Sequence, residues 1–452
     1  MRDLSNAEEL YLMQKMLKHF KGDGIKAQLL KGASGTVGLK SINILLTLVI
    51  GVLLARTLGP ENYGVYAFVL SLVTLMGLPT KAGLPTLLVR ETAKNQLNEK
   101  WGLIRGLFKL SNIFVFTYSL ILTAGAGLFV WWQWGGEDAI KANTFLWALL
   151  LLPLIAYEGV RTGTLRGLRW VVSSQLPQLL VRPLVMILLI GSCLLLGKEL
   201  TSITAIQFNA LAALAAFIVG VYFLNKALPK EVKKATSEYD FKPWAISLLP
   251  LSLFAGLRML DSQVSILLLG ILGTAEEVGL FRVAATGATL VAFGLTAVNM
   301  ALAPQVARLY NAGEMEKLQR TITLSTRAVA LVSFPVALVL ILWGKELITL
   351  VFGVEYSGAA TALSILCVGQ LVNASAGSVA VVLNMTGNDK KTLYGVLVAL
   401  VSNVSLAFIM IPLFGIVGAA IGYAFSLSLW NITLMYMAKK HTGLNTFLIS
   451  NK

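Results

Sequence analysis

The chain has 452 residues, of which 56% are hydrophobic and only 13% are charged, and its formal net charge is +15. Because an average soluble domain carries about 25% charged residues, a chain this apolar cannot cover itself with polar surface, and a soluble globular protein is excluded. On a soluble chain the positive charge would suggest nucleic acid. Here the basic residues gather in alternate loops between apolar segments, so no nucleic-acid partner is predicted.

The first segment of the chain is polar and patterned. Its apolar residues recur three or four positions apart, with lysines between them: Leu10, Met13, Leu17 and Phe20. This spacing predicts an amphipathic helix on the cytoplasmic membrane surface within residues 1–35, and a solvated terminus is the alternative.

Apolar stretches of about 20 residues then recur, each long enough for a helix to cross a hydrocarbon core of ~30 Å. We expect six spans before a polar linker at 225–243: 36–57, 63–88, 109–132, 143–162, 173–196 and 202–224. Six more follow the linker: 244–271, 277–303, 321–343, 357–385, 392–412 and 415–437. Since backbone polar groups find no partners in lipid, this pattern predicts an all-α integral membrane protein of about twelve transmembrane helices.

The basic residues alternate between the two sides of the predicted bundle. One set of loops, together with both ends of the chain, holds most of the lysines and arginines. The opposite set holds little beyond Arg56, Lys141, Lys198 and Lys345. By the positive-inside rule both termini are cytoplasmic, including the tail at 438–452.

The chain also repeats itself. LGPENYGVYAF at 58–68 resembles LGTAEEVGLFRVA at 272–284, with a shift of 215 residues (278 minus 63). Six helices per half then predict two parallel-related six-helix lobes, an N-lobe at 36–224 and a C-lobe at 244–437, around a central cavity. A chance likeness between apolar helices is the alternative.

The break at Gly59-Pro60 predicts a tight hairpin at the outer surface, because proline fixes φ and glycine tolerates the turn. We expect Tyr63 and Tyr66 at the depth of the lipid headgroups and Arg56 snorkelling outward.

Charged side chains deep in a span cost about 2.5–3.5 kcal/mol each on insertion scales, so those that are retained point to function. Such residues occur in the second, seventh and eighth predicted spans: Lys81, Arg258, Asp261 and Arg282. Because cations dominate, Lys81, Arg258 and Arg282 are the candidate lining of a cationic substrate pathway. A hydrated cavity of this kind favours an anionic cargo, such as a diphosphate or an acidic sugar.

Structural alternatives stand beside these assignments. Arg258 and Asp261 are three residues apart, so they share a helix face and can form a neutralised pair. Glu158 and Arg161 have the same spacing near the inner end of the fourth span, where the structural interpretation is favoured. Arg182 is interpreted as snorkelling to the interface.

Several classes of function find no support in the sequence. No G-x-x-x-x-G-K-[ST] pattern occurs, so no ATP-driven motor is predicted. The outer loops are too short for a catalytic domain, so an enzyme is not expected. The two cysteines and two histidines lack the spacing of a metal site, so no metal or cofactor is predicted.

Two long motifs resemble a known family. LLARTLGPENYGVYAFVLSLVTLMGLPTKAGLPTLLVRETA at 53–93 resembles the opening helices of the polysaccharide, or lipid-linked oligosaccharide, flippases. These form a branch of the multidrug/oligosaccharidyl-lipid/polysaccharide exporter superfamily. RMLDSQVSILLLGILGTAEEVGLFRVA at 258–284 resembles that family's signature at the start of the second half.

The resemblance implies two lobes forming a V around a central cavity lined by the first, second, seventh and eighth helices. It implies a multi-pass protein of the bacterial inner membrane. By alternating access, such a protein turns undecaprenyl-diphosphate-linked oligosaccharide from the inner to the outer leaflet, for O-antigen, capsule or exopolysaccharide assembly. Partners would be the lipid-linked substrate, membrane lipids, and the polysaccharide polymerase and export machinery.

Uphill flux would need proton or sodium coupling, for which Asp261 is the first candidate and Glu158 the second. One alternative is a cation-coupled multidrug antiporter of the same superfamily, although that function favours deep acids. Another is a lipid II-type flippase, although those proteins commonly carry two further spans.

Overall fold

The computed structural model describes residues 25–81, 83–133 and 139–448, and within these ranges the chain is helical with no strand. The predicted surface helix of residues 1–35 lies largely outside the described residues. Its last part, from Ile25, belongs to the first long helix.

The first half contains these elements: α2 (Ile25–Met76), α3 (Leu78–Lys81), α4 (Leu84–Leu97), α5 (Trp101–Gln133), α6 (Ala139–Ala148), α7 (Leu151–Gly167), α8 (Val171–Leu176), the π-helical η1 (Pro177–Val181), α9 (Arg182–Leu195) and α10 (Ser202–Ala227). The second half contains α11 (Lys230–Lys234), α12 (Phe241–Leu272), α13 (Ala275–Asn311), α14 (Met315–Leu342), α15 (Gly344–Val351), the 3-10 helix η2 (Val354–Ala359), α16 (Ala360–Ala376), α17 (Val379–Met385) and α18 (Asp389–Thr442).

Ten helical segments of the described residues are long and apolar enough to cross a membrane. Two of them are helical hairpins. In each, the chain reverses at a glycine with non-helical backbone angles, Gly59 in α2 and Gly415 in α18. The legs lie side by side: a Cβ on Gly51 would be 3.8 Å from the Tyr63 hydroxyl, and Ser426 Oγ donates to the Ala399 carbonyl at 2.8 Å. With each hairpin counted as two crossings, the ten segments correspond to the twelve predicted spans, and the all-α membrane fold is confirmed.

Glycine is required at both reversals because φ is 69° at Gly59 and 53° at Gly415, a region that side chains with a Cβ rarely adopt. The hairpin predicted at Gly59-Pro60 is therefore confirmed.

The two ends of the molecule are named by what they carry. We call the end with Gly59 and Gly415 the hairpin end. We call the opposite end, with the α4–α5 and α10–α12 connections, the basic end.

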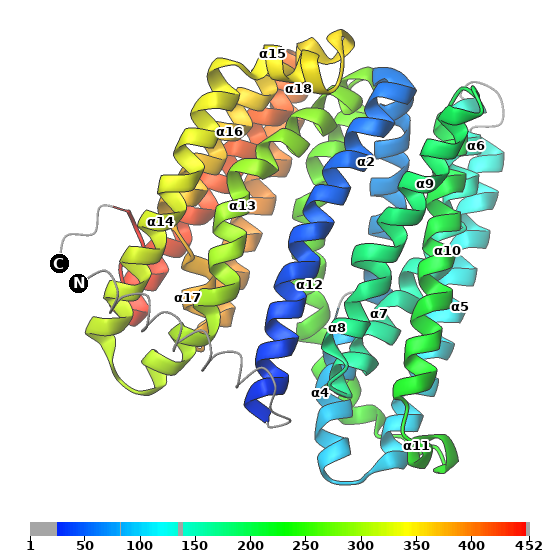
Figure 1. Cartoon of the computed structure of the whole chain (residues 1–452), viewed down its shortest axis with the longest axis vertical. Coiled ribbons are helices and arrows are strands. Elements are labelled where there is room, and N and C mark those ends of the chain that lie inside the picture. Colours follow the sequence, from blue (N-terminus) through cyan, green and yellow to red (C-terminus); the bar gives the residue numbers. More distant parts are fainter. Residues whose placement is uncertain (1–24, 82, 134–138, 449–452) are drawn as a thin grey trace, which may run out of the picture.

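The helices form two groups with α2, α12 and α13 between them (Figure 1). Helices α14, α16 and α18 lie in one group, and α4, α5, α7, α9 and α10 lie in the other. Helix α12 contacts both groups. Its first turns place the buried Trp244 against Leu87 and Leu88 of α4, whereas the same helix packs along α18 further on. The predicted division into lobes at 36–224 and 244–437 stays a prediction.

The two segments of the predicted repeat lie against each other at the hairpin end. A Cβ on Gly64 would be 1.6 Å from the Ala275 carbonyl oxygen, and one on Gly279 would be 2.1 Å from the Pro60 carbonyl oxygen. Any side chain at either glycine would collide with backbone, so α2 and α13 meet here in direct main-chain contact.

The predicted linker at 225–243 is held against the start of α5 at the basic end. Arg105 Nη1 donates to the carbonyls of Lys233 at 2.8 Å and Ala235 at 2.5 Å, and Glu238 N donates to the Gly102 carbonyl at 3.0 Å. The connection between the two halves is therefore fixed to the first half.

Glu277 joins the start of α13 to the α18 hairpin. Its Oε2 accepts from Thr274 N at 2.9 Å, while Thr274 Oγ1 accepts from Glu277 N at 3.2 Å, which completes a capping box. Its other oxygen, Oε1, accepts from Ile416 N at 3.2 Å. One carboxylate thus satisfies backbone donors from two chain segments far apart in sequence.

We expect Glu277→Ala to lower the free energy of unfolding by about 1–3 kcal/mol, because a helix cap and a tertiary hydrogen bond are both lost. Thermal unfolding in detergent measures this, with Glu276→Ala, an exposed acid in the same turn, as the matched control. Equal melting temperatures for the two variants would contradict the role given to Glu277.

Candidate functional site

A cavity of about 250 Å³ lies between the two legs of α2 and the second half of the chain. We call it the central cavity. Its lining is Thr47, Ile50, Gly51, Leu54, Tyr63, Tyr66, Ala67, Leu70, Ser71 and Thr74 from α2, Gln263 from α12, and Arg282 and Thr286 from α13. None of these residues is acidic, and one of them is a permanent cation.

Arg282 supplies the positive charge of the central cavity. Its guanidinium lies beside the Tyr63 hydroxyl, and no ion pair joins it to an acid among the residues described. A guanidinium stays protonated in proteins and offers five N–H donors in a planar fork. The wall of the cavity therefore carries an unneutralised cation suited to a phosphate or a carboxylate.

The two tyrosines of the first motif do not face the lipid headgroups, as the sequence suggested, but are packed inside the protein. Tyr63 and Tyr66 are only 3% and 6% exposed. Their rings stack at 6.3 Å, and Tyr63 meets Tyr356 edge-on at 6.5 Å. The prediction failed because the contact with the second half of the chain, which buries them, leaves no mark in the local sequence.

Arg56 also has a different role from the one predicted. It is exposed, but it donates from Nε to the Val351 carbonyl at 2.7 Å and from Nη2 to the Leu350 carbonyl, at the end of α15. The last carbonyls of a helix carry partial negative charge, which a cation satisfies. Tyr356 donates to the Ala55 carbonyl at 2.8 Å close by. Together with the contact at Gly64 these bonds join α2 to the second half of the chain at the hairpin end, next to the central cavity.

Lys81 has an acidic partner from another helix. Its Nζ lies 3.7 Å from Glu158 Oε2 of α7, and the two side chains are 29% and 20% exposed. Arg161, predicted as the partner of Glu158, instead donates to the carbonyls of Ala216 and Phe217 of α10 at 3.3 and 3.4 Å. Lys81 is not among the residues that line the central cavity.

Arg258 and Asp261 lie on α12, where it packs on α18. Arg258 is exposed and sits over the ring of Trp430 with 5.9 Å between its Cζ and the ring centroid, a cation–π contact. Asp261 lies near Asn403 and Tyr423, and its Oδ1 is buried without a hydrogen-bond partner. Of the three predicted pathway cations, only Arg282 lines the central cavity; Lys81 pairs with Glu158 and Arg258 with an aromatic ring.

A second cavity of about 240 Å³ adjoins the central cavity and shares Thr47, Ile50 and Tyr66 with it. We call it the side pocket. Arg182 lines it and donates from Nε and Nη2 to Asn209 Oδ1, at 3.3 and 2.7 Å. Asn209 Nδ2 in turn donates to the Tyr66 hydroxyl at 2.6 Å.

The snorkelling predicted for Arg182 is therefore wrong. The signal that sequence reasoning missed is the deep polar residue Asn209 on α10, because an amide inside an apolar span needs a partner.

The family model described as "Polysaccharide biosynthesis protein" matches residues 29–310, and a model described as "MatE" matches residues 252–409. The probable flippase AglR of Haloferax volcanii is 26% identical over 222 residues, which cover 48% of this chain and 44% of that protein. The matched region thus spans less than half the length of this relative.

Solved structures share the fold at low sequence identity. An inward-facing multidrug resistance MATE family transporter of the MOP superfamily aligns with a TM-score of 0.73 at 16% identity, covering 89% of this chain and 94% of that one. The lipid II flippase MurJ in an inward closed conformation aligns with a TM-score of 0.71 at 12% identity, covering 89% and 86%. Since the first family model spans more than half of the residues, the chain belongs to the polysaccharide biosynthesis protein family, and it shares the fold of these two membrane proteins.

Proposed function

We propose that this protein turns a diphosphate-linked oligosaccharide on an undecaprenyl tail from the cytoplasmic to the outer leaflet of the bacterial inner membrane. The observation that carries the proposal is Arg282, a cation without an acidic partner among the described residues, at the wall of the central cavity. The family match and the name of the archaeal relative, a probable flippase, support the same class of cargo.

The proposed orientation places the basic end in the cytoplasm and the hairpin end outside. It rests on the lysines and arginines that gather at the basic end, such as Arg90, Lys94, Lys230 and Lys234, compared with the few at the hairpin end. In this orientation the contacts of Arg56, Gly64 and Tyr356 close the outer side. The headgroup would then enter from the cytoplasm while the prenyl tail stays in lipid.

The central cavity would hold the diphosphate. A diphosphate presents several acceptor oxygens, and the lining offers donors to them from the Arg282 guanidinium, the Tyr63 hydroxyl and the Gln263 amide. A charge-assisted hydrogen bond contributes about 1.5–3 kcal/mol. Rocking of the two helix groups about their contact would break the bonds at the hairpin end and release the headgroup outside, where polymerase and export machinery would receive it.

Asp261 is the proposed site of ion coupling. A carboxylate oxygen that is buried without a hydrogen bond is costly as long as it stays charged, and binding of a proton or a sodium ion would neutralise it. Asn403 of α18 lies close enough to share such an ion. Because α12 contacts both helix groups, occupancy at Asp261 would act on the element that joins them.

A multidrug antiporter is the second candidate. The MatE match over residues 252–409 and the fold of the multidrug transporter favour it. However, the central cavity is lined by a cation and by none of the acids that would attract cationic drugs. The lining therefore favours the anionic cargo.

We expect Arg282→Gln to slow the flipping of a fluorescent undecaprenyl-diphosphate glycan in proteoliposomes at least tenfold, because a charge-assisted contact of about 1.5–3 kcal/mol is lost. Arg308→Gln, an exposed arginine further along α13, is the matched control and should stay within about twofold of the wild type. Equal flipping rates for both variants would contradict the proposal that the diphosphate binds in this cavity.

Asp261→Asn should abolish the stimulation of flipping by an imposed proton or sodium gradient, since the amide cannot exchange a proton or balance a cation. Downhill exchange of substrate without a gradient should persist. Rates with and without each gradient measure this, and Glu346→Gln, an exposed acid on α15, is the control. Full stimulation in Asp261→Asn, or none in the wild type, would contradict the coupling role.

A further inference from the structure

We infer that the side pocket holds the sugar attached directly to the diphosphate, and that Arg182 and Gln178 recognise it. This inference rests on the proposed function, since it places the next group of the same substrate. Its first support is position: the side pocket and the central cavity share Thr47, Ile50 and Tyr66. A group bonded to a diphosphate in the central cavity can reach the side pocket without crossing another wall.

The size of the side pocket fits one sugar. Its volume of about 240 Å³ is close to the 250 Å³ of the central cavity, so it has room for a group of the size of one sugar ring. Beyond Arg182 the space narrows to a cavity of about 10 Å³ between Glu158, Arg161 and Gln178, enough for one water molecule. A second ring would find no room on the side of this small cavity, so the rest of the glycan would stay in the central cavity.

The lining has the chemistry of sugar recognition. Amides from Asn43, Gln178 and Asn209 surround the guanidinium of Arg182, and the ring of Tyr66 forms part of the wall. Sugar hydroxyls both donate and accept, which amides match, and the apolar face of a pyranose packs on an aromatic ring. The lining contains no acid, so nothing in it competes for the guanidinium.

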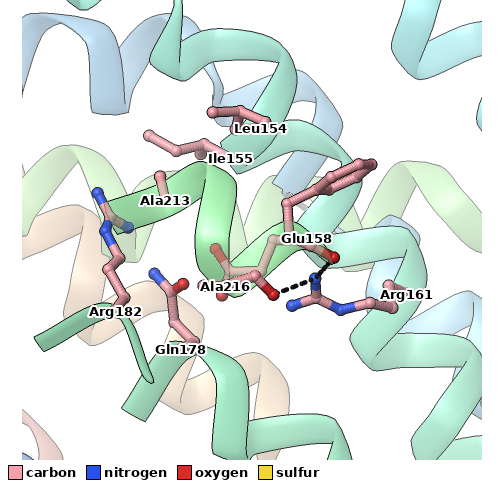
Figure 2. Close-up of a pocket in the computed structure, with 9 residues that line it drawn as sticks. Leu154, Ile155, Glu158, Arg161, Gln178, Arg182, Ala213 and Ala216 are labelled. Carbon is pink, nitrogen blue, oxygen red and sulfur yellow. Dashed lines mark hydrogen bonds between the residues drawn. The ribbon is translucent and has the colours of Figure 1, made fainter. Parts of the chain in front are cut away.

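Two of these side chains have unused hydrogen-bonding capacity. Arg182 spends two of its five N–H groups on Asn209 and has no other partner among the described residues. The Gln178 side chain makes no hydrogen bond to any residue that the structure describes. It lines the side pocket and also, together with Arg182, the small adjoining cavity that Figure 2 draws. Both groups therefore offer donors, and Gln178 also an acceptor, to a ligand.

The backbone between them is unusual. Residues Pro177–Val181 form a π-helical turn between α8 and α9, so Gln178 lies within the wide turn and Arg182 directly follows it. Such turns are rare and occur frequently at functional sites, because the extra residue re-aims the side chains that follow. Asn209, itself held by the Tyr66 hydroxyl, fixes the guanidinium in place. The pocket is thus preorganised before a ligand arrives.

The experiment measures binding to the full chain in nanodiscs. The probes are undecaprenyl diphosphate and the same lipid carrying one glucose, one galactose or one N-acetylglucosamine. We expect the wild type to bind at least one sugar-bearing probe about tenfold more tightly than the bare diphosphate. Gln178→Leu and Arg182→Met should each remove that preference and leave binding of the bare diphosphate within about twofold. Gln178→Leu breaks no internal hydrogen bond, so it serves even where Arg182→Met fails to fold.

The controls separate this inference from the proposed function. Arg282→Gln should weaken the binding of every diphosphate probe equally and keep the preference for the sugar. Arg169 is an exposed arginine at the basic end, and Arg169→Met should leave the binding of all probes unchanged. The inference is overturned if the wild type prefers no sugar-bearing probe, or if the preference survives in both pocket variants. In either case, weaker diphosphate binding by Arg282→Gln would still support the proposed function. A wild type that binds no diphosphate probe overturns both.

Discussion

The constraint on which this account depends is an arginine inside an apolar bundle that no acid of the described residues neutralises. Charge in a low-dielectric interior is expensive unless it is paired or solvated. Lys81 is paired with Glu158, Arg161 with the carbonyls of α10, and Arg182 with Asn209. Among the residues that the structure describes, Arg282 has beside it a tyrosine hydroxyl and the open space of the central cavity, and no acid within ion-pair distance. The molecule therefore retains a cost that an anionic ligand would offset.

The close contact of α2 with α13 makes that arrangement possible. Gly64 and Gly279 let the two backbones touch, and this contact brings Tyr63 from one half of the chain against Arg282 from the other. The Arg56 and Tyr356 bonds lie on the same side of the cavity. Opening at the hairpin end would break these Arg56 and Tyr356 bonds and leave the contacts within each helix group intact. Rigid-body motion about an interface requires this.

Local patterns in the sequence were enough to predict the spans. Apolar runs of membrane length and the Gly59-Pro60 break predicted helices and a hairpin that the structure confirms, because length, hydropathy and backbone conformation are local properties. The likeness between the segments around Gly64 and Gly279 also pointed to the two elements that meet. The burial of Tyr63 and the bonds of Arg56 could not be predicted, since both depend on contacts with residues about 300 positions away.

The candidate site was only partly accessible from sequence for the same reason. Spacing along one helix paired Glu158 with Arg161, whereas the structure brings Lys81 of α3 to Glu158. The same reasoning treated Arg182 as a surface residue because its partner, Asn209, is 27 positions away on α10. Counting deep charges marked Arg282, which lines the central cavity, but a count cannot tell which cations are neutralised by another helix.

The most direct measurement is an electron cryomicroscopy structure of the protein in nanodiscs containing undecaprenyl diphosphate. The account predicts density for the diphosphate in the central cavity, within hydrogen-bond distance of the Arg282 guanidinium, with the prenyl tail leaving between the two helix groups. An empty central cavity with the lipid headgroup bound elsewhere on the protein would contradict it.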